Sequence, residues 1–179
     1  MKSFSLLNYS KLLLIALVVT LSAVSCNKDD DDEKDPVYLG TWSRTETVII
    51  DEFELDVKDI MTFTKNSVTN LGQIYNPLTE EWIDLMGLKG SLSVDGNSMD
   101  VTVDEIGFSD TDLDGLPTGD MTYYDSGDPE FDALLNEFEL EENFEAEYSV
   151  AGNQLTLKTD DNSDGDFNDE GETAVYTKE

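Results

Sequence analysis

The segment "FEAEYSVAGNQLTLKT", residues 144–159, decides the fold class because it holds two strand patterns and the turn between them. Four apolar residues alternate with polar ones in its first half and so share one face of an extended strand: Phe144, Ala146, Tyr148 and Val150. The Gly-Asn pair that follows is typical of a tight hairpin turn. Leu155 and Leu157 then share a face again, so the segment predicts an antiparallel β-hairpin.

The same alternation recurs along the chain from residue 37 onward. "LKGSLSV" and "MDVTV" flank the turn "DGNS", which predicts a second hairpin whose apolar face carries Leu92, Val94, Met99, Val101 and Val103. Further strands are predicted at 38–50, 60–64, 68–75, 121–124 and 172–177. Consecutive hairpins without long crossover helices favour an all-β, antiparallel up-and-down barrel of about eight strands, and a β-sandwich is the alternative. A barrel is preferred because closure removes exposed strand edges.

One segment has a helical pattern. In "SGDPEFDALLNEFE", residues 126–139, Asp128 stands at the cap position and Pro129 in the first turn. An apolar stripe follows at helical spacing: Phe131, Leu134, Leu135 and Phe138. We predict one short amphipathic helix that covers an open side or end of the sheet, and a mobile lid over a pocket is a second interpretation.

The charge balance excludes several functions. The chain has 10 basic and 41 acidic residues, a formal net charge of -31, so it repels nucleic acid and anionic membranes and attracts cations. It has no histidine and one cysteine, which removes nucleophile systems that need histidine and metal sites built from histidine and cysteine. Only carboxylates remain for catalysis, as in a glycosidase, and a carboxyl of raised pKa beside an ionised one would indicate such a site. We expect a protein that is not an enzyme.

The N-terminal segment has the order of a secretory signal. Lys2 and Lys11 precede the apolar run "LLLIALVV", residues 12–19, and small residues then lead to Cys26. As a membrane span, residues 12–24 would be short, since crossing a bilayer takes roughly 20 residues. The segment predicts an export signal that is removed.

"LSAVSC" resembles the lipobox of bacterial lipoproteins, with Ala23, Val24 and Ser25 before the cysteine. The looser form, without leucine three positions before Cys26, resembles that of Bacteroidetes-type lipoproteins. The resemblance implies that Cys26 is lipidated and becomes the new N-terminus. An ordinary signal peptide that leaves a free thiol is the alternative.

The run "NKDDDDEKD" after Cys26 predicts an extended, self-repelling tether. Acidic runs at this place resemble surface-export signals of Bacteroidetes-type lipoproteins, which implies an outer-membrane protein anchored by lipid and facing the cell exterior; the periplasmic face is the alternative. Three segments result: a signal peptide at 1–25, the lipidated cysteine and acidic tether at 26–36, and a β domain at 37–179. Loss of Lys2 and Lys11 takes the charge to about -33.

The motif "LGTW" opens the first predicted strand, with Gly40 followed by Trp42. In this motif and in the hairpin at 148–159, the chain resembles lipocalin-like barrels of small bacterial lipoproteins. The resemblance implies that Trp42 lies across the closed end of the barrel. The chain departs from the family pattern because Arg44 is its only arginine, so no arginine near the C-terminus can pack on Trp42, and Lys178 would be a poor substitute.

Two acidic loops resemble calcium-binding loops. Both carry oxygen ligands at alternate positions followed by glycine, the spacing that lets a loop turn sharply around a hard cation. The first loop offers Asp110, Asp112 and Asp114, and the second offers Asp160, Asn162, Asp164, Asp166, Asn168 and Glu172. Glu172 stands one place later than the usual bidentate glutamate. We predict calcium as a structural cofactor at both loops, and solvated acidic turns are the alternative.

Two function hypotheses follow. In the first, a lipid-anchored barrel, stabilised by calcium, binds a small apolar molecule. In the second, a calcium-stiffened adhesion or assembly module with a filled core acts through a protein partner. In both cases the membrane is a partner through the lipid anchor, and nucleic acid is not.

Overall fold

The computed structural model describes residues 35–50, 53–113, 115–138, 140–160, 166–169 and 172–179. The predicted signal peptide, Cys26 and most of the predicted tether lie outside these residues. The described chain forms nine strands and one helix: β1 (Gly40–Ile50), β2 (Phe53–Phe63), β3 (Ser67–Asn76), β4 (Glu81–Asp95), β5 (Ser98–Thr111), β6 (Pro117–Asp125), α1 (Pro129–Glu137), β7 (Asn143–Ala151), β8 (Gln154–Thr159) and β9 (Thr173–Lys178).

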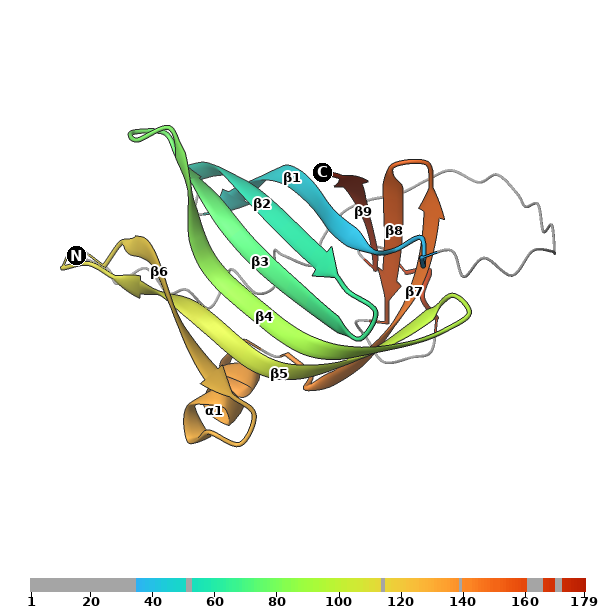
Figure 1. The fold of residues 1–179 in the computed structure, drawn as a ribbon. Coiled ribbons are helices and arrows are strands. Elements are labelled where there is room, and N and C mark those ends of the chain that lie inside the picture. The colour runs from blue at the N-terminus through green and yellow to red at the C-terminus, as the bar shows by residue number, and fades with distance from the viewer. Residues whose placement is uncertain (1–34, 51–52, 114, 139, 161–165, 170–171) are drawn as a thin grey trace.

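Eight of the strands close an antiparallel barrel, which confirms the predicted fold class (Figure 1). Strands β1 to β5 pair in chain order, the first part of β5 pairs with β7, and β7, β8 and β9 continue the sheet back to β1. The additional strand β6 pairs with the second part of β5, from Glu105 to Thr111. β5 therefore pairs with β7 up to Thr102 and with β6 from Glu105 onward. Beyond Thr102 the sheet that forms the barrel wall divides, because β6 and β7 separate there.

The helix α1 covers the place where the wall divides. It connects β6 to β7 in the chain and lies beside these strands (Figure 1), and its apolar stripe packs on apolar residues of β5. Phe131 and Leu135 are buried against Val103 and Ile106, and the ring of Phe138 stacks on Phe108 with centroids 4.6 Å apart. The predicted helix and its covering role are confirmed. Within the described part of the chain, no helix has the length and apolar character needed to cross a membrane.

The N-cap of α1 is Asp128, as predicted, and Pro129 begins the helix. The Asp128 side chain does not bond a helical N–H group, however. Its Oδ2 instead accepts a hydrogen bond of 3.2 Å from the backbone N–H of Asp125, which ties the turn before the helix. Here the short turn from β6 competes with the helix for the same acceptor.

The antiparallel pairing assigns the connections to two ends of the barrel. The turns β2–β3, β4–β5 and β7–β8 lie at one end, together with the start of β1. The turns β1–β2, β3–β4 and β5–β6 and the connection from β8 to β9 lie at the other end. Both predicted calcium loops therefore belong to this second end, which we call the open end.

The end at which β1 starts is closed by an aromatic core. Trp42 is fully buried, and its Nε1 donates a hydrogen bond of 2.7 Å to the carbonyl oxygen of Tyr38. The Tyr38 ring packs edge-on against Phe63 and Tyr148, with centroid distances of 6.2 and 5.4 Å. Trp42 and the Tyr38 ring therefore lie together in the core at the end of the barrel where β1 starts.

Lys178 takes the position expected for an arginine. Its Nζ lies 5.1 Å from the centroid of the Trp42 ring, within the range of a cation–π contact. The same lysine contacts the space above Gly40, where a Cβ would lie 3.3 Å from its Cε, and Gly40 has φ of +117°. Lys178 thus lies near both residues of the motif, with Nζ over the Trp42 ring and Cε beside Gly40.

Several strands are longer than predicted: besides β2 and β4, β5 extends to Thr111 and β6 begins at Pro117. β2 begins at Phe53 and β4 at Glu81, whereas the sequence pattern predicts strands from residues 60 and 88. In β4 the register with β3 shifts between Gly72 and Gln73, and the register with β5 shifts between Lys89 and Gly90. Each irregularity adds one residue to a strand, Leu85 to β4 and Asp104 to β5. Beyond the added residue the inward-facing positions change from odd to even numbers or the reverse, so a simple alternation pattern does not continue through it.

The core position of Trp42 allows a direct test with the two tryptophans of the chain. Trp42→Ala should lower the free energy of unfolding by about 3 to 5 kcal/mol, because it leaves a large cavity in the closed end. Trp82→Ala is the matched control, since Trp82 is 37 % exposed and packs only beside Tyr75 among the aromatic residues. Urea unfolding followed by circular dichroism measures both, and equal losses would contradict the placement of Trp42.

Candidate functional site

Three charged residues point into the barrel from the inward faces of β1 and β2. Arg44 and Glu46 alternate with the same parity as buried Trp42 and Val48 on β1. Asp59 has the parity of buried Val57 and Phe63 on β2, and it is only 5 % exposed. Buried charges of this kind are stable only when they are paired and hydrogen-bonded.

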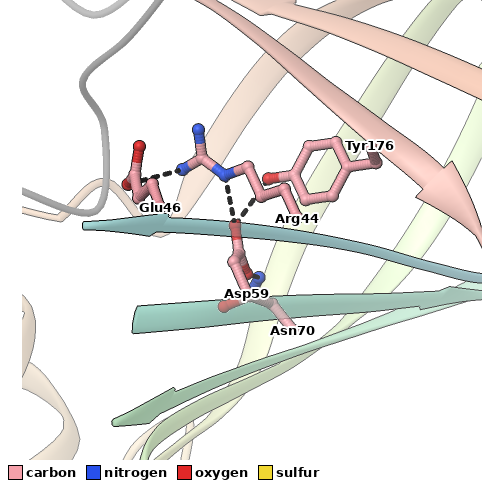
Figure 2. A network of polar contacts seen from close by, with 5 residues as sticks. All are labelled: Arg44, Glu46, Asp59, Asn70 and Tyr176. Carbon is pink, nitrogen blue, oxygen red and sulfur yellow. Dashed lines mark hydrogen bonds and ion pairs between the residues drawn. The ribbon is translucent and has the colours of Figure 1, made fainter. Parts of the chain in front are cut away.

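Asp59 is the centre of a polar network that joins four strands (Figure 2). Its Oδ2 accepts hydrogen bonds from Arg44 Nε, at 3.2 Å, and from the hydroxyl of Tyr176, at 2.6 Å. Its Oδ1 accepts a short hydrogen bond from Asn70 Nδ2. The four residues lie on β1, β2, β3 and β9, so one carboxylate ties together the strands on both sides of the junction between β1 and β9.

Tyr176 contributes both a proton and a ring to this network. The guanidinium of Arg44 lies over its ring, with Cζ 5.3 Å from the centroid. Burial, with the neighbouring Asp59 carboxylate, raises the pKa of Tyr176 well above its ordinary value of 10.0. The hydroxyl therefore stays protonated and donates to Asp59 throughout the physiological range.

Glu46 occupies the edge of the network and is less well paired. Its Oε1 is buried and has no hydrogen-bond partner, and Arg44 Nη2 lies 3.9 Å from it. Burial raises the pKa of Glu46; Arg44 opposes this shift and Asp59 adds to it. The site thus contains one carboxylate that is fully bonded and one whose charge is only partly compensated.

A raised-pKa carboxyl beside a second carboxylate is also the arrangement that a glycosidase would need. In this barrel the partner is Asp59, and both of its oxygens are already bonded to protein donors. A nucleophile or general base must have an oxygen available to substrate or water. Neither oxygen of Asp59 is therefore without a protein donor in this network.

The apolar surroundings of Glu46 form a small cluster in the open half of the barrel. Val48 and Val57 are buried there against Leu55 and Ile74. Ile83 pairs with Ile74 in the register of β3 and β4, so it faces the same interior. Leu55, Ile74 and Ile83 are only partly buried, unlike the apolar residues of the closed end.

The first predicted calcium loop forms the turn between β5 and β6. Asp110 Oδ1 accepts a hydrogen bond of 3.0 Å from Thr122 Oγ1, and Asp112 Oδ1 accepts one of 2.9 Å from the N–H of Leu116. Both residues are exposed, and Asp114 lies outside the described residues. The two described carboxylates each stabilise their own hairpin.

The second predicted calcium loop connects β8 to β9. Asn168 Oδ1 accepts a hydrogen bond of 2.7 Å from Lys158, and Asp166 Oδ1 accepts one of 3.1 Å from the Asn168 N–H. Glu172 is 3 % exposed; its Oε2 accepts from the Asp169 N–H at 2.9 Å, and its buried Oε1 has no hydrogen-bond partner. Asp160 is half-buried, while Asn162 and Asp164 lie outside the described residues.

Calcium binding stays a prediction at both loops. Among the residues that the structure describes, no group of three or more acidic side chains is arranged to hold a metal ion. Members of each predicted ligand set lie outside those residues, so neither set is seen complete. Buried Glu172 is the predicted ligand whose environment best suits a cation.

The sequence reasoning missed the Arg44, Glu46, Asp59 network. A signal for it exists in "TWSRTETVII", residues 41–50, where two charged residues share the parity of Trp42 and Val48. A charge on the apolar face of a strand predicts a buried partner on a neighbouring strand. Which of the 41 acidic residues would be that partner depends on the pairing of β1 with β2.

Removal of the central carboxylate should destabilise the barrel. Asp59→Asn leaves the buried Arg44 without its counter-charge, so we expect a loss of about 3 kcal/mol in the free energy of unfolding. Asp56→Asn on the same strand is the control, because Asp56 is exposed and bonds only Thr47 in the described structure. Its effect should stay below about 0.5 kcal/mol. A small effect of Asp59→Asn in urea unfolding would contradict the assigned role of Asp59.

The raised pKa of Glu46 predicts a pH-dependent effect of its replacement. Stability falls as pH rises from 4.5, the ordinary value, through the folded-state pKa, because the folded chain binds the proton more tightly than the unfolded one. Glu46→Gln removes this loss, so its melting temperature should exceed that of the parent at neutral pH. The advantage should shrink as pH falls through that interval.

Thermal melts over a pH series measure the difference in melting temperature between Glu46→Gln and the parent. The other acidic residues are the same in both chains, so their contribution to the pH dependence drops out of this difference. Glu54→Gln is the control, because it removes one charge from an exposed position of β2. A lower melting temperature of Glu46→Gln at neutral pH would show that Glu46 stabilises the fold, contrary to this prediction.

Comparison with known proteins assigns neither a family nor a function to this chain. No protein-family model and no curated protein sequence matches this chain. The function must therefore be inferred from the barrel and its interior.

Proposed function

We propose that this chain is a lipid-anchored, lipocalin-like binding protein that holds a small molecule with an apolar body in the open half of its barrel. The observation that carries the proposal is the contrast between the two halves of the interior. Trp42, Met99 and Leu155 in the closed half are at most 1 % exposed. Leu55, Ile74 and Ile83 in the open half face inward and are only partly buried. A core filled by its own side chains would bury both sets alike.

Exposed apolar residues at the open end support the same proposal. Ile49, Leu78, Leu113 and Leu116 are largely or fully exposed, and they belong to the ends of the β1–β2, β3–β4 and β5–β6 hairpins. Leu78 at the tip of the β3–β4 hairpin is 92 % exposed. An apolar rim favours the entry of an apolar ligand, and it also favours the second candidate, an adhesion or assembly module that docks a protein partner.

The proposed location depends on the N-terminal sequence. Lipidation at Cys26 would anchor the chain, since each buried methylene contributes about 0.8 kcal/mol and more than one acyl chain makes the anchor stable. The acidic run at 29–33 would hold the barrel away from the membrane surface. We place the protein at the outer membrane, facing the cell exterior.

Calcium is proposed as a structural cofactor of the open end. An ion at either acidic loop would offset repulsion among carboxylates there and order the connection. Calcium binding to the folded chain alone would raise its stability.

Native mass spectrometry of the mature chain purified from its own host, with and without chelator, tests ligand and calcium together. We expect a co-purifying small molecule, and we expect a loss of calcium mass on chelation. The absence of any small molecule would contradict the binding function and favour the adhesion module. An unchanged mass after chelation would contradict calcium binding and leave the ligand proposal intact.

A further inference from the structure

We propose that the open half of the barrel selects ligands with an apolar body and a protonated amine, and that the amine pairs with Glu46. This inference rests on the proposed binding function and names the chemical class of its ligand. It follows from the distribution of charge in the network shown in Figure 2.

The first step is the unmet bonding capacity of Glu46. Its Oε1 is buried without a hydrogen-bond donor, although its side chain as a whole is 22 % exposed. A buried carboxylate oxygen without a hydrogen-bond donor costs free energy. A hydrogen bond from the N–H group of a cation would offset this cost best, because both partners are charged. Part of the side chain is thus in contact with solvent, and a ligand amine would have to displace that solvent and reach the carboxylate.

The second step is that Arg44 already donates a hydrogen bond to Asp59 and pairs with its charge. Its Nε donates to Asp59, its guanidinium lies over the Tyr176 ring, and its Nη2 is 3.9 Å from Glu46. The last distance is too long for a hydrogen bond. Among the described residues of this network, Arg44, Glu46 and Asp59 carry two negative charges and one positive charge, so a bound monocation would balance the charges of these three residues.

The raised pKa of Glu46 agrees with this charge balance. Burial is the largest cause and disfavours the carboxylate; Arg44 opposes this effect and Asp59 adds to it, so the pKa of Glu46 is raised although an arginine lies nearby. An anionic head group, such as the carboxylate of a fatty acid, would add a third negative charge. The site therefore discriminates against acids by repulsion and in favour of amines by pairing.

The third step is the surroundings of Glu46. The apolar cluster of Val48, Val57, Leu55 and Ile74 lies next to it on β1, β2 and β3, with Val57 directly opposite Glu46 in the register, and offers contact to an alkyl or aryl body. The open end also carries both acidic loops, with Asp110, Asp112 and Asp166 exposed on them. A rim of one charge sign raises the local concentration of ligands with the opposite sign.

Competition binding with three probes of equal chain length tests the inference. The protein is the chain from residue 26 with Cys26→Ser, which keeps every described residue and needs no detergent. The neutral dye N-phenyl-1-naphthylamine reports occupancy, and dodecylamine, dodecanol and dodecanoate compete with it below their micelle concentrations. We expect dodecylamine to bind about tenfold more tightly than dodecanol, and dodecanoate more weakly than both.

Two variants separate a specific pair from general attraction. Glu46→Gln should remove the advantage of dodecylamine over dodecanol, while Glu54→Gln should keep that advantage. Circular dichroism verifies that both variants fold. High salt should weaken only the part of the preference that comes from the rim.

The outcomes distinguish the proposed binding function from the proposed pairing of an amine with Glu46. If neither the dye nor dodecanol binds, the proposed binding function fails. If dodecanol binds and the amine has no advantage, or if Glu46→Gln keeps the advantage, the binding function stands and the pairing with Glu46 is overturned.

Discussion

The barrel depends on the carboxylate of Asp59. Strand β9 closes the sheet against β1 over a short register, with Trp42 opposite Lys178 and Ser43 opposite Thr177. So short a junction supplies few backbone hydrogen bonds, and side chains must hold it together. Asp59 does so from β2, because it accepts from Arg44 on β1 and from Tyr176 on β9. Lys178 over Trp42 and the ion pair of Lys58 with Glu179, at 2.8 Å, reinforce the same junction.

This way of closing the barrel gives its interior two different halves. The closed half is an aromatic and aliphatic core around Trp42, in which polar groups are few and bonded. The other half begins at the Asp59 network, because buried charges need hydrogen-bond donors and exclude close apolar packing around themselves. Glu46 lies at that boundary and keeps an unbonded oxygen. The network that completes the sheet therefore also creates the polar group best placed to recognise a ligand.

Much of the fold could be predicted because alternation is a local property. The hairpin at 144–159, the stripe of Phe131, Leu134, Leu135 and Phe138, and the Gly40, Trp42 motif each depend on neighbouring residues alone. The first half of β4 could not be predicted in the same way. A bulge at Leu85 reverses its parity, and Gly87 there and Gly107 on β5 have their place because the Tyr123 side chain would lie 2.5 and 2.6 Å from an added Cβ. Those contacts join distant parts of the chain.

The sequence by itself determined an all-β chain, a short covering helix, a large acidic excess and the absence of histidine, since composition and local periodicity carry these properties. It also showed that Arg44 and Glu46 share a face with Trp42. Only the tertiary structure decided that Asp59, among 41 acidic residues, is the partner of Arg44, and that Glu46 is left partly uncompensated. The reason is physical: pairing and desolvation depend on the strand register and on the closure of the sheet, which join residues far apart in the chain.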